Sequence, residues 1–380
     1  MKLATGVRDF ARAAGLIAPL IDGNAKSEVL RAMYLTAGDG RVTLSINTLD
    51  HYAEVTFAAK VEREGDCASP GARISALLAA LPDSAAIQIE ANANGVTFTS
   101  GRSRYRLPAW PIGDLPAPLV LGEPIGEVEL EHANAVRVFT EPLFAAAIEK
   151  VRFNLNGVLL QTSEESLFAV TTDGSRLCRV MLPVKANLSS DRKLIVPLPA
   201  VRHIIKLLKI AWSERVTLRR SRTLLEIEDE RIRFVTKLVD GEFPPYDRII
   251  PTPAGNSVIC GNAELSLALR RLAAIGNGAL SGVPVCGLEW HAGENCLRLS
   301  LPRQGDSAAD AVGADVIGEC RLAVGLNYFA ELVEQAPGTR LHLNATSSSN
   351  VAIIATDPDN NSWLSLLMPM HWPQSRAEAA

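Results

Sequence analysis

The segment Asp173-Gly174-Ser175-Arg176 contains the residue types of a nucleophile turn, because a serine stands beside a glycine and close to a carboxylate. A serine attacks a substrate only when a neighbouring base activates it, and the turn that presents it in many hydrolases has the pattern G-x-S-x-G. The segment lacks this pattern, and the spacing indicates no histidine or carboxylate partner. An enzyme that uses Asp173 or Ser175 is therefore the alternative from another functional class, and we expect no catalytic residue.

The stretch Asp357-Pro358-Asp359-Asn360-Asn361 resembles the start of a calcium-binding loop. Such a loop needs a glycine at its sixth position and a glutamate at its twelfth. These positions hold Ser362 and Met368. We therefore interpret the stretch as a surface turn and expect no metal site.

Cysteine usage and the N-terminal residues indicate a cellular compartment. None of the six cysteines forms a CxxC pair, and no histidine lies at metal-ligand spacing from them, which predicts buried, reduced thiols. The first residues carry a charge every few positions, and no apolar run reaches the roughly 18 residues of a membrane span. We expect a cytoplasmic protein without membrane contact. No phosphate-binding glycine motif occurs either, so we expect no cofactor.

A supersecondary pattern repeats three times along the chain. Its first copy is an amphipathic helix over Arg73–Leu81, with Ile74 on the apolar face, and an alternating strand over Ala86–Glu90. The same pattern recurs at Val201 and at Phe329, and the steps from Ile74 to Val201 and from Val201 to Phe329 are 127 and 128 residues. Equal steps of one pattern indicate tandem copies of one unit.

Each third of the chain also opens with its own helix, which completes the repeated unit. Apolar positions at helical spacing predict these helices around Val7–Ile17, Val136–Phe139 and Leu265–Leu272, and the second must end before Pro142. Alternating strands fill the remainder, and the proline-rich stretches Leu115–Pro124 and Pro244–Pro253 are the expected linkers. The fold class is therefore α+β, with two helices on antiparallel sheet in each of three tandem copies.

The predicted helices concentrate basic residues although the chain has a net charge of −4. If equivalent helices line one side, these charges converge on a face that contacts phosphates without reading bases. An ordinary solvated helix surface is the alternative interpretation. The basic positions are Arg8, Arg12, Arg73, Arg202, His203, Lys206, Lys209, Arg270 and Arg271.

Five further segments resemble the motifs of one family, the bacterial beta sliding clamps (DNA polymerase III beta subunits). In chain order they are Ser100–Tyr105, Leu155–Gly157, Val170–Leu177, Lys237–Tyr246 and Leu367–Met370. They resemble the family segments SGRSRF, LNG, ATDGHRL, KLVDGRFPDY and VMPM. The resemblance covers nearly the whole chain.

The resemblance implies a DNA-clamp fold and a non-enzymatic role as a processivity factor in DNA replication. Clamp domains would span residues 1–122, 123–250 and 251–372, and residues 373–380 would form a disordered tail. Two chains would join head to tail as a homodimer and close a ring around double-stranded DNA without sequence preference. Partners would be the DNA polymerase, the clamp loader and repair factors, while a specialised paralogue that serves an accessory polymerase or titrates clamp partners is the alternative.

The resemblance also implies three sets of site residues. A partner-peptide pocket between the second and third domains would include Leu155, Thr172, Gly174, Ser175, Arg176, Leu177, Pro244, Arg248, Ile249, Ser348, Asn350, Leu366, Leu367, Met368, Pro369 and Met370. DNA would be contacted by Lys26, Arg73, Arg152, Phe153, Arg202 and Lys206. The dimer interface would include Arg102, Arg104, Tyr105 and Ile275, with Asp306 and Asp310 as the acidic residues opposite the arginines. Gly174 is expected to adopt a positive φ in a tight turn.

Overall fold

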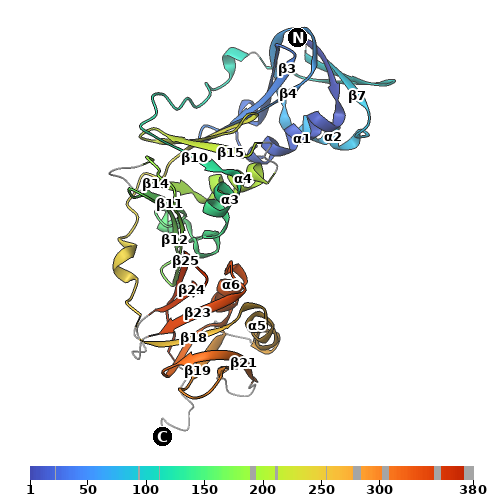
Figure 1. Ribbon diagram of the computed structural model, residues 1–380. Coiled ribbons are helices and arrows are strands. Elements are labelled where there is room, and N and C mark those ends of the chain that lie inside the picture. The colour runs from blue at the N-terminus through green and yellow to red at the C-terminus, as the bar shows by residue number, and fades with distance from the viewer. Residues whose placement is uncertain are drawn as a thin grey trace. The chain divides into compact units, whose positions relative to one another are not determined.

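The chain forms two compact units in a computed structural model (Figure 1). The structure describes all 380 residues except 22, 93–94, 111, 189–193, 210–212, 254, 277–283, 302–307, 346–351 and 372–380, so the predicted tail lies outside the described residues. Unit 1 comprises residues 1–136, 186–190 and 196–240, and unit 2 comprises residues 137–185, 191–195 and 241–380. In the described parts of both units, no helix is long and apolar enough to cross a membrane.

Six α-helices occur among the described residues, two in each third of the chain. They are α1 (Val7–Ile17), α2 (Gly71–Ala80), α3 (His132–Thr140), α4 (Leu198–Leu208), α5 (Asn262–Gly276) and α6 (Leu326–Gln335). Short 3-10 helices are η1 (Ala18–Leu20), η2 (Glu28–Arg31), η3 (Ile112–Asp114), η4 (Leu143–Ala145), η5 (Lys150–Arg152) and η6 (Tyr246–Ile249). The helix α3 ends before Pro142, because proline lacks the N–H that a continuing helix needs. The predicted pair of helices in each third is confirmed.

A five-stranded antiparallel sheet in unit 1 packs against α1. Its order is β5 (Lys60–Arg63), β1 (Lys2–Gly6), β7 (Ala86–Asn92), β8 (Gly95–Ser100) and β9 (Ser103–Leu107). Phe10 of α1 is fully buried, and its ring lies 5.9 Å from that of Phe57 and 6.5 Å from that of Phe98. Arg8 and Arg12 face outward from the same helix, as the apolar spacing predicts.

An eight-stranded sheet in unit 1 joins the first and second thirds of the chain. Its order is β10 (Gly126–Glu131), β15 (Arg215–Arg220), β16 (Leu224–Glu228), β17 (Ile232–Lys237), β4 (His51–Ala58), β3 (Arg41–Asn47), β2 (Ala32–Gly38) and β6 (Gly65–Pro70). The thirds meet where β17 pairs with β4, with Arg233 opposite Glu54. Arg233 also donates to the buried Glu226 at 2.7 Å, and Arg219 holds the same carboxylate at 3.3 Å. A charged cross-strand ladder therefore supports this junction.

A twelve-stranded sheet contains most of unit 2 and joins the second and third thirds. Its order is β14 (Leu194–Pro197), β11 (Gly157–Thr162), β12 (Leu167–Thr172), β13 (Arg176–Leu182), β25 (Asn360–Leu367), β24 (Ile353–Asp357), β23 (Arg340–Ala345), β18 (Asn256–Gly261), β21 (Ala308–Ile317), β20 (Cys296–Leu301), β19 (Val285–Trp290) and β22 (Cys320–Gly325). The thirds meet at the antiparallel pair β13–β25. Pro358 and Asp359 form the turn between β24 and β25, which confirms the predicted surface turn.

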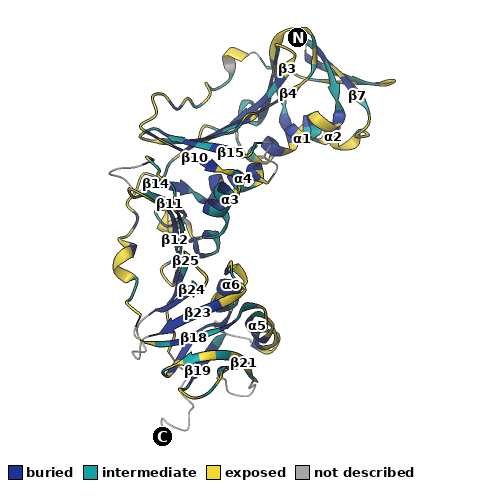
Figure 2. Ribbon diagram, viewed as in Figure 1, coloured by how far each residue is buried: buried dark blue, intermediate teal, exposed yellow. Residues whose placement is uncertain are grey.

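Buried residues line the strands of both units (Figure 2): they alternate with exposed ones along β7 and β10, whereas most residues of β11 and β12 are buried. Trp290 and Trp363 are the largest fully buried side chains of unit 2, and α5 packs against α6 there. Because two sheets run across the predicted domain borders, the borders at residues 122 and 250 stay a prediction. The α+β class with antiparallel sheets is confirmed.

His203 corrects the sequence analysis, which placed it among the exposed basic residues of its helix. Its side chain is buried, with 4% exposed, between α4 and β17. Burial lowers the pKa of His203 to about 4, because the charged imidazolium loses its hydration. The expectation of a charge at this position was wrong, because His203 lies with Ala200 and Leu207, at helical spacing, on the buried face of the helix, although the exposed Lys206 stands at the edge of that face.

Candidate functional site

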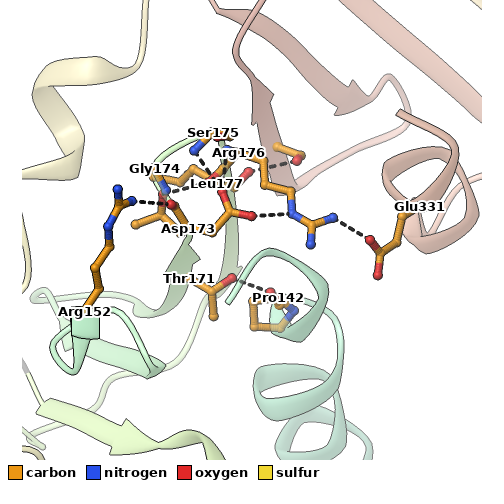
Figure 3. Close-up of polar contacts among 11 residues, drawn as sticks. Pro142, Arg152, Thr171, Asp173, Gly174, Ser175, Arg176, Leu177 and Glu331 are labelled. Carbon is orange, nitrogen blue, oxygen red and sulfur yellow. Dashed lines mark hydrogen bonds and ion pairs between the residues drawn. The ribbon is translucent and has the colours of Figure 1, made fainter. Parts of the chain in front are cut away.

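A tight turn between β12 and β13 is the centre of the candidate site (Figure 3). Asp173 Oδ1 accepts hydrogen bonds from the backbone N–H groups of Ser175, at 2.8 Å, and Arg176, at 3.0 Å. Thr172 Oγ1 accepts a hydrogen bond from the N–H of Gly174 at 3.1 Å and donates one to the carbonyl oxygen of Arg176 at 2.7 Å. Gly174 has a φ of 91°, which confirms the predicted positive φ. Side chains next to the glycine therefore fix the turn from within.

The same turn argues against the nucleophile alternative. Asp173 Oδ1 accepts hydrogen bonds from two backbone N–H groups, and its Oδ2 accepts one from Arg176 Nε at 2.9 Å. A carboxylate held in this way stabilises a turn and an ion pair instead of activating Ser175, whose side chain is exposed. Among the described residues, no cluster of three or more histidine, cysteine, aspartate or glutamate side chains could hold a metal ion.

Arg176 is a buried charge that is paired with two carboxylates. Its residue is 8% exposed, and its guanidinium bonds Asp173 at 2.9 Å and Glu331 of α6 at 2.5 Å. The guanidinium carbon also lies 4.5 Å from the centre of the Tyr328 ring and 5.6 Å from that of Phe144. A buried guanidinium is tolerated only when it is paired and bonded in this way. Arg176 thus links β13 to α6.

Three of these partners were missed by sequence reasoning: Phe144, Tyr328 and Glu331. A signal for Tyr328 was present, because it lies off the buried face formed by Phe329, Leu332 and Val333, and 37% of it is exposed. A large aromatic side chain on the outer side of an amphipathic helix is an ordinary mark of a binding surface. Nothing in the sequence indicated that this helix lies beside Arg176.

The end of β25 brings the predicted methionines to the surface next to the turn. Leu366 and Leu367 are buried opposite Leu177 and Arg176 in the β13–β25 pair, so they support the surface from below. Beyond the strand, the Met368 N–H donates to the Ser175 carbonyl at 2.8 Å, and Met368 is 43% exposed.

Met370 lies at the same surface, one residue beyond Pro369, which is half-buried. Its N–H donates to the Ala323 carbonyl at 2.7 Å, and it is 38% exposed. Its sulfur lies 3.6 Å from where a Cβ on Gly325 would stand, at the start of the helix that carries Tyr328. Two thioethers and a tyrosine ring thus form an exposed apolar surface over a buried ion pair.

A neighbouring segment of unit 2 holds Pro244, Arg248 and Ile249, all exposed. Tyr246 anchors it, because its hydroxyl contacts Gln161 of β11 at 3.2 Å and burial raises its pKa to about 12. Leu155 is buried, with 7% exposed. The predicted pocket residues Ser348 and Asn350 lie outside the described part of the chain.

The predicted DNA residues are exposed in both units. Lys26, Arg73, Arg202 and Lys206 are exposed in unit 1, the last three on α2 and α4. Arg152 and Phe153 are exposed in unit 2, where the Arg152 guanidinium donates to the Asp173 carbonyl at 2.9 Å. Arg271 of α5 bonds Asp310 at 2.7 Å, so its charge is partly neutralised within the chain.

The predicted dimer residues lie at a sheet edge and on a helix. Arg104 and Tyr105 are exposed on β9, the last strand of the five-stranded sheet, and Arg102 lies in the turn before it. Ile275 is 49% exposed on α5. Of the two acidic residues expected opposite the arginines, Asp310 bonds Arg271 and Asp306 lies outside the described residues.

Two family descriptions match consecutive parts of the chain. The N-terminal domain of the DNA polymerase III beta subunit matches residues 1–119, and the central domain of the same protein matches residues 129–245. Together the matches cover more than half of the chain.

Curated relatives extend this likeness over most of the chain. The beta sliding clamp of Vibrio cholerae is 26% identical over 358 residues, which are 92% of this chain and 94% of that protein. The beta sliding clamp of Salmonella typhimurium is 28% identical over 344 residues, 89% of this chain and 88% of that protein. The beta sliding clamp of Escherichia coli K12 is 27% identical over 343 residues, with the same coverage.

Solved structures share the fold. A DnaN sliding clamp from Bartonella birtlesii bound to griselimycin has a TM-score of 0.90 at 22% identity and covers 98% of this chain and 99% of its own. The sliding clamp from Pseudomonas aeruginosa bound to griselimycin has a TM-score of 0.91 at 21% identity, with the same coverage. At this identity the likeness establishes the fold.

Proposed function

Because the chain belongs to the DNA polymerase III beta subunit family, the sliding clamps, we propose that it closes into a ring around duplex DNA and holds a DNA polymerase on its template. The observation that carries the proposal is the threefold repeat of a helix pair on antiparallel sheet, in a fold that matches solved clamps over 98% of the chain. The chain acts topologically and not as an enzyme, in the cytoplasm and without a cofactor. Nothing observed favours the paralogue alternative, since the named relatives are described as beta sliding clamps.

The ring is a head-to-tail homodimer in this proposal. In unit 1, β9 pairs with β8 alone among the described strands, so it forms an edge of its sheet. In unit 2, β21 pairs with β20 over Ala308–Gly313 and with β18 over Ala314–Ile317, which leaves each half one neighbour among the described strands. Such edges pair with a second chain by adding main-chain hydrogen bonds. Tyr105 and Ile275 would add apolar contact beside these strands.

Contact with DNA in this proposal is weak and sequence-independent. The chain carries a net charge of −4, so only a restricted face can attract phosphates. Exposed Arg73, Arg202 and Lys206 on helices would supply that face. Contacts of this kind fall steeply with salt, but a closed ring stays on DNA because leaving requires an interface to open.

Docking of polymerase, loader and repair factors uses the surface around Met368, Met370 and Tyr328. Methionine side chains adapt to different partners, which suits one surface that several linear peptides share. The buried Arg176 and its ion pairs hold the backbone beneath that surface. Two solved clamps are bound to griselimycin, so we propose that this chain binds it as well and that its dependence on the two methionines be tested.

The decisive experiment is a polymerase assay with clamp loader on circular primed DNA. The chain should extend the length synthesised per binding event, and Met368→Ala with Met370→Ala should abolish that gain while the dimer stays intact. Hot spots concentrate in such apolar contacts, so a loss of partner affinity of a hundredfold or more, about 3 kcal/mol, is expected. The matched control is Val120→Ala with Ile125→Ala, two exposed residues of unit 1.

Two outcomes would contradict the proposal separately. If the wild-type chain gives no stimulation with loader present, the processivity role is wrong. If the double methionine variant binds partners and griselimycin as the wild type does, the docking surface is misplaced. Sedimentation at nanomolar concentration tests the ring, since a monomer there would contradict a stable dimer.

A further inference from the structure

The strand β21 of unit 2 has an unpaired edge along its first half, and one hydrogen bond fixes the direction of that edge. The Ala314 N–H donates to the Asn295 carbonyl oxygen at 3.1 Å, on the side of β20. Successive N–H groups of a strand point to opposite sides, so those of Ala309, Ala311 and Gly313 point away from β20. The strand β18 pairs with β21 only from Ala314 onward, so these three N–H groups face no other described strand.

Carboxylates of the same chain cap two of these three N–H groups. The Ala311 N–H donates to Asp310 Oδ1 at 2.9 Å, and the Gly313 N–H donates to Glu264 Oε1 at 3.4 Å. Glu264 belongs to the first turn of α5, which packs against β21 (Figure 1). Charged side chains at a sheet edge prevent it from pairing with unrelated strands. The edge of β21 is therefore protected while no partner strand covers it.

Arg271 of α5 holds Asp310 in the capping position. Its Nε donates to Asp310 Oδ2 at 2.7 Å, while Oδ1 stays on the Ala311 N–H. The hydrogen bond from Arg271, and then that from Ala311, lower the pKa of Asp310, so the carboxylate stays ionised at neutral pH. The Arg271 side chain is 59% exposed, and an exposed ion pair contributes little to the stability of a fold. The position of this pair at the edge is thus its main physical consequence.

We propose that Asp310, positioned by Arg271, is a displaceable cap of the β21 edge: it bonds the Ala311 N–H while the edge is unpaired and releases it when a second copy of the chain adds a strand there. The inference rests on the proposed ring. It also changes the role of Asp310, which the family resemblance places opposite arginines as an attracting charge. A partner strand must bring a carbonyl oxygen to an N–H that is already bonded, so the cap competes with the partner and stabilises the open interface.

The charges of the two edge strands identify β9 of a second copy as the occupant. The strand β9 carries Arg104 and Arg106 and no carboxylate, whereas β21 carries Asp310 and Asp315 and no basic residue. Pairing of β21 with β21 of a second copy would bring like charges together, which is destabilising across a strand pair. Pairing of β9 with β21 avoids this repulsion. The capping carboxylates therefore favour a head-to-tail contact over a tail-to-tail one.

The test measures the strength and the opening rate of the dimer. Sedimentation over a dilution series gives the dissociation constant, and native mass spectrometry of mixed ¹⁵N-labelled and unlabelled protein gives the rate of subunit exchange. The variant is Asp310→Ala. Its matched control is Asp359→Ala, which removes the carboxylate of another exposed ion pair, formed with Arg340 at 2.7 Å in the turn between β24 and β25. Circular dichroism checks that both variants are folded.

Asp310→Ala should lower the dissociation constant about fivefold and slow subunit exchange, because the open edge loses its cap. Asp359→Ala should leave both quantities unchanged. Arg271→Gln should lower the dissociation constant by a smaller factor, since Asp310 then caps the edge without support. In the Asp310→Ala background, Arg271→Gln should have no further effect, because a positioning residue acts through the side chain that it holds.

A higher dissociation constant for Asp310→Ala would show that Asp310 attracts the partner, and an unchanged constant would show that no cap is displaced. Either result would overturn the inference. Ala311→Pro tests the interface separately, because proline is tolerated at an edge position whose N–H points outward but cannot donate to a partner strand. It should weaken the dimer about tenfold, and an unchanged dimer would mean that this edge lies outside the interface. If the wild type is a monomer throughout the dilution series, the proposed ring fails, and this inference fails with it.

Discussion

A pH titration of stability tests the buried His203 and its half-buried neighbour His51 in unit 1. The ring of His203 lies 5.3 Å from that of Phe234, and the ring of His51 lies 5.9 Å from it on the strand pair that joins the first two thirds. His51 Nδ1 has Thr236 Oγ1 as a partner at 2.9 Å, whereas His203 Nε2 is buried without a hydrogen-bond partner among the described residues. Protonation of His203 would therefore place an unpaired charge in the core.

The magnitude follows from the pKa of His203, which burial lowers from 6.5 to about 4, with smaller effects from the nearby His51 and Lys206. As the pH falls below 6.5 the unfolded chain takes up a proton that the folded chain refuses, so unfolding becomes easier. The stability contributed by neutral His203 is complete above pH 6.5 and is lost as the pH falls towards 4. At about 1.4 kcal/mol per pKa unit, the loss is about 2 kcal/mol at pH 5 and about 3 kcal/mol below pH 4.

The assay is urea unfolding, followed by circular dichroism at pH 7.5 and pH 5.0. The variant His203→Phe keeps a ring against Phe234 but cannot titrate, so it should lose about 2 kcal/mol less stability than the wild type over this interval. His51, whose pKa burial also lowers, titrates in both proteins. His291→Phe, at a side chain that is 44% exposed, is the matched control and should behave as the wild type does. Equal losses in the wild type and His203→Phe would refute the reasoning.

Two further substitutions test a charged ladder and a strained turn. Glu226→Gln leaves Arg219 and Arg233 with one fewer charged partner at a site only 5% exposed, and should cost about 2 kcal/mol in urea unfolding. A cost below about 0.5 kcal/mol would mean that the ladder carries no stability. Gly174→Ala places a side chain at a φ of 91°, so it should cost about 1–2 kcal/mol in urea unfolding. Gly255→Ala, at a similar φ of 81° with open space around it, should cost about the same, because the Arg152 guanidinium beside Gly174 ends a flexible side chain and can move aside; a clearly larger cost at Gly174 would contradict this.

The features that the sequence predicted well are local ones. Helix periodicity depends on residues three and four positions apart, so α1 and α6 could be located from their apolar positions alone. The positive φ of Gly174 follows in the same way, since a tight turn between two strands needs a residue without a side chain there. Because the same helix and strand pattern recurs three times, these local predictions also gave the architecture of three tandem α+β units.

The features that the sequence could not predict depend on contacts between distant residues. Glu331 lies 155 positions from Arg176 in the chain, and helix periodicity tells which side of α6 is buried but not which strand end it meets. His203 is a second residue whose environment depends on a contact with a distant part of the chain. Its residue type suggests a surface charge, and only its place on α4 against Phe234 makes it a neutral core residue.

The two exposed methionines, Met368 and Met370, stand on a backbone that hydrogen bonds hold in place. The backbone of Met368 is fixed by the Ser175 carbonyl and that of Met370 by the Ala323 carbonyl, while both side chains reach solvent. In the docking function that we propose, a partner would order only side chains there, because the backbone has already lost its freedom on folding, and the entropic cost of binding would be correspondingly small. Burial of the Arg176 guanidinium is costly, and its ion pairs with Asp173 and the half-exposed Glu331 offset that cost and hold the backbone under an adaptable surface. A variant that loosens the turn should therefore weaken all partners together, whereas a change in one thioether should alter their relative affinities.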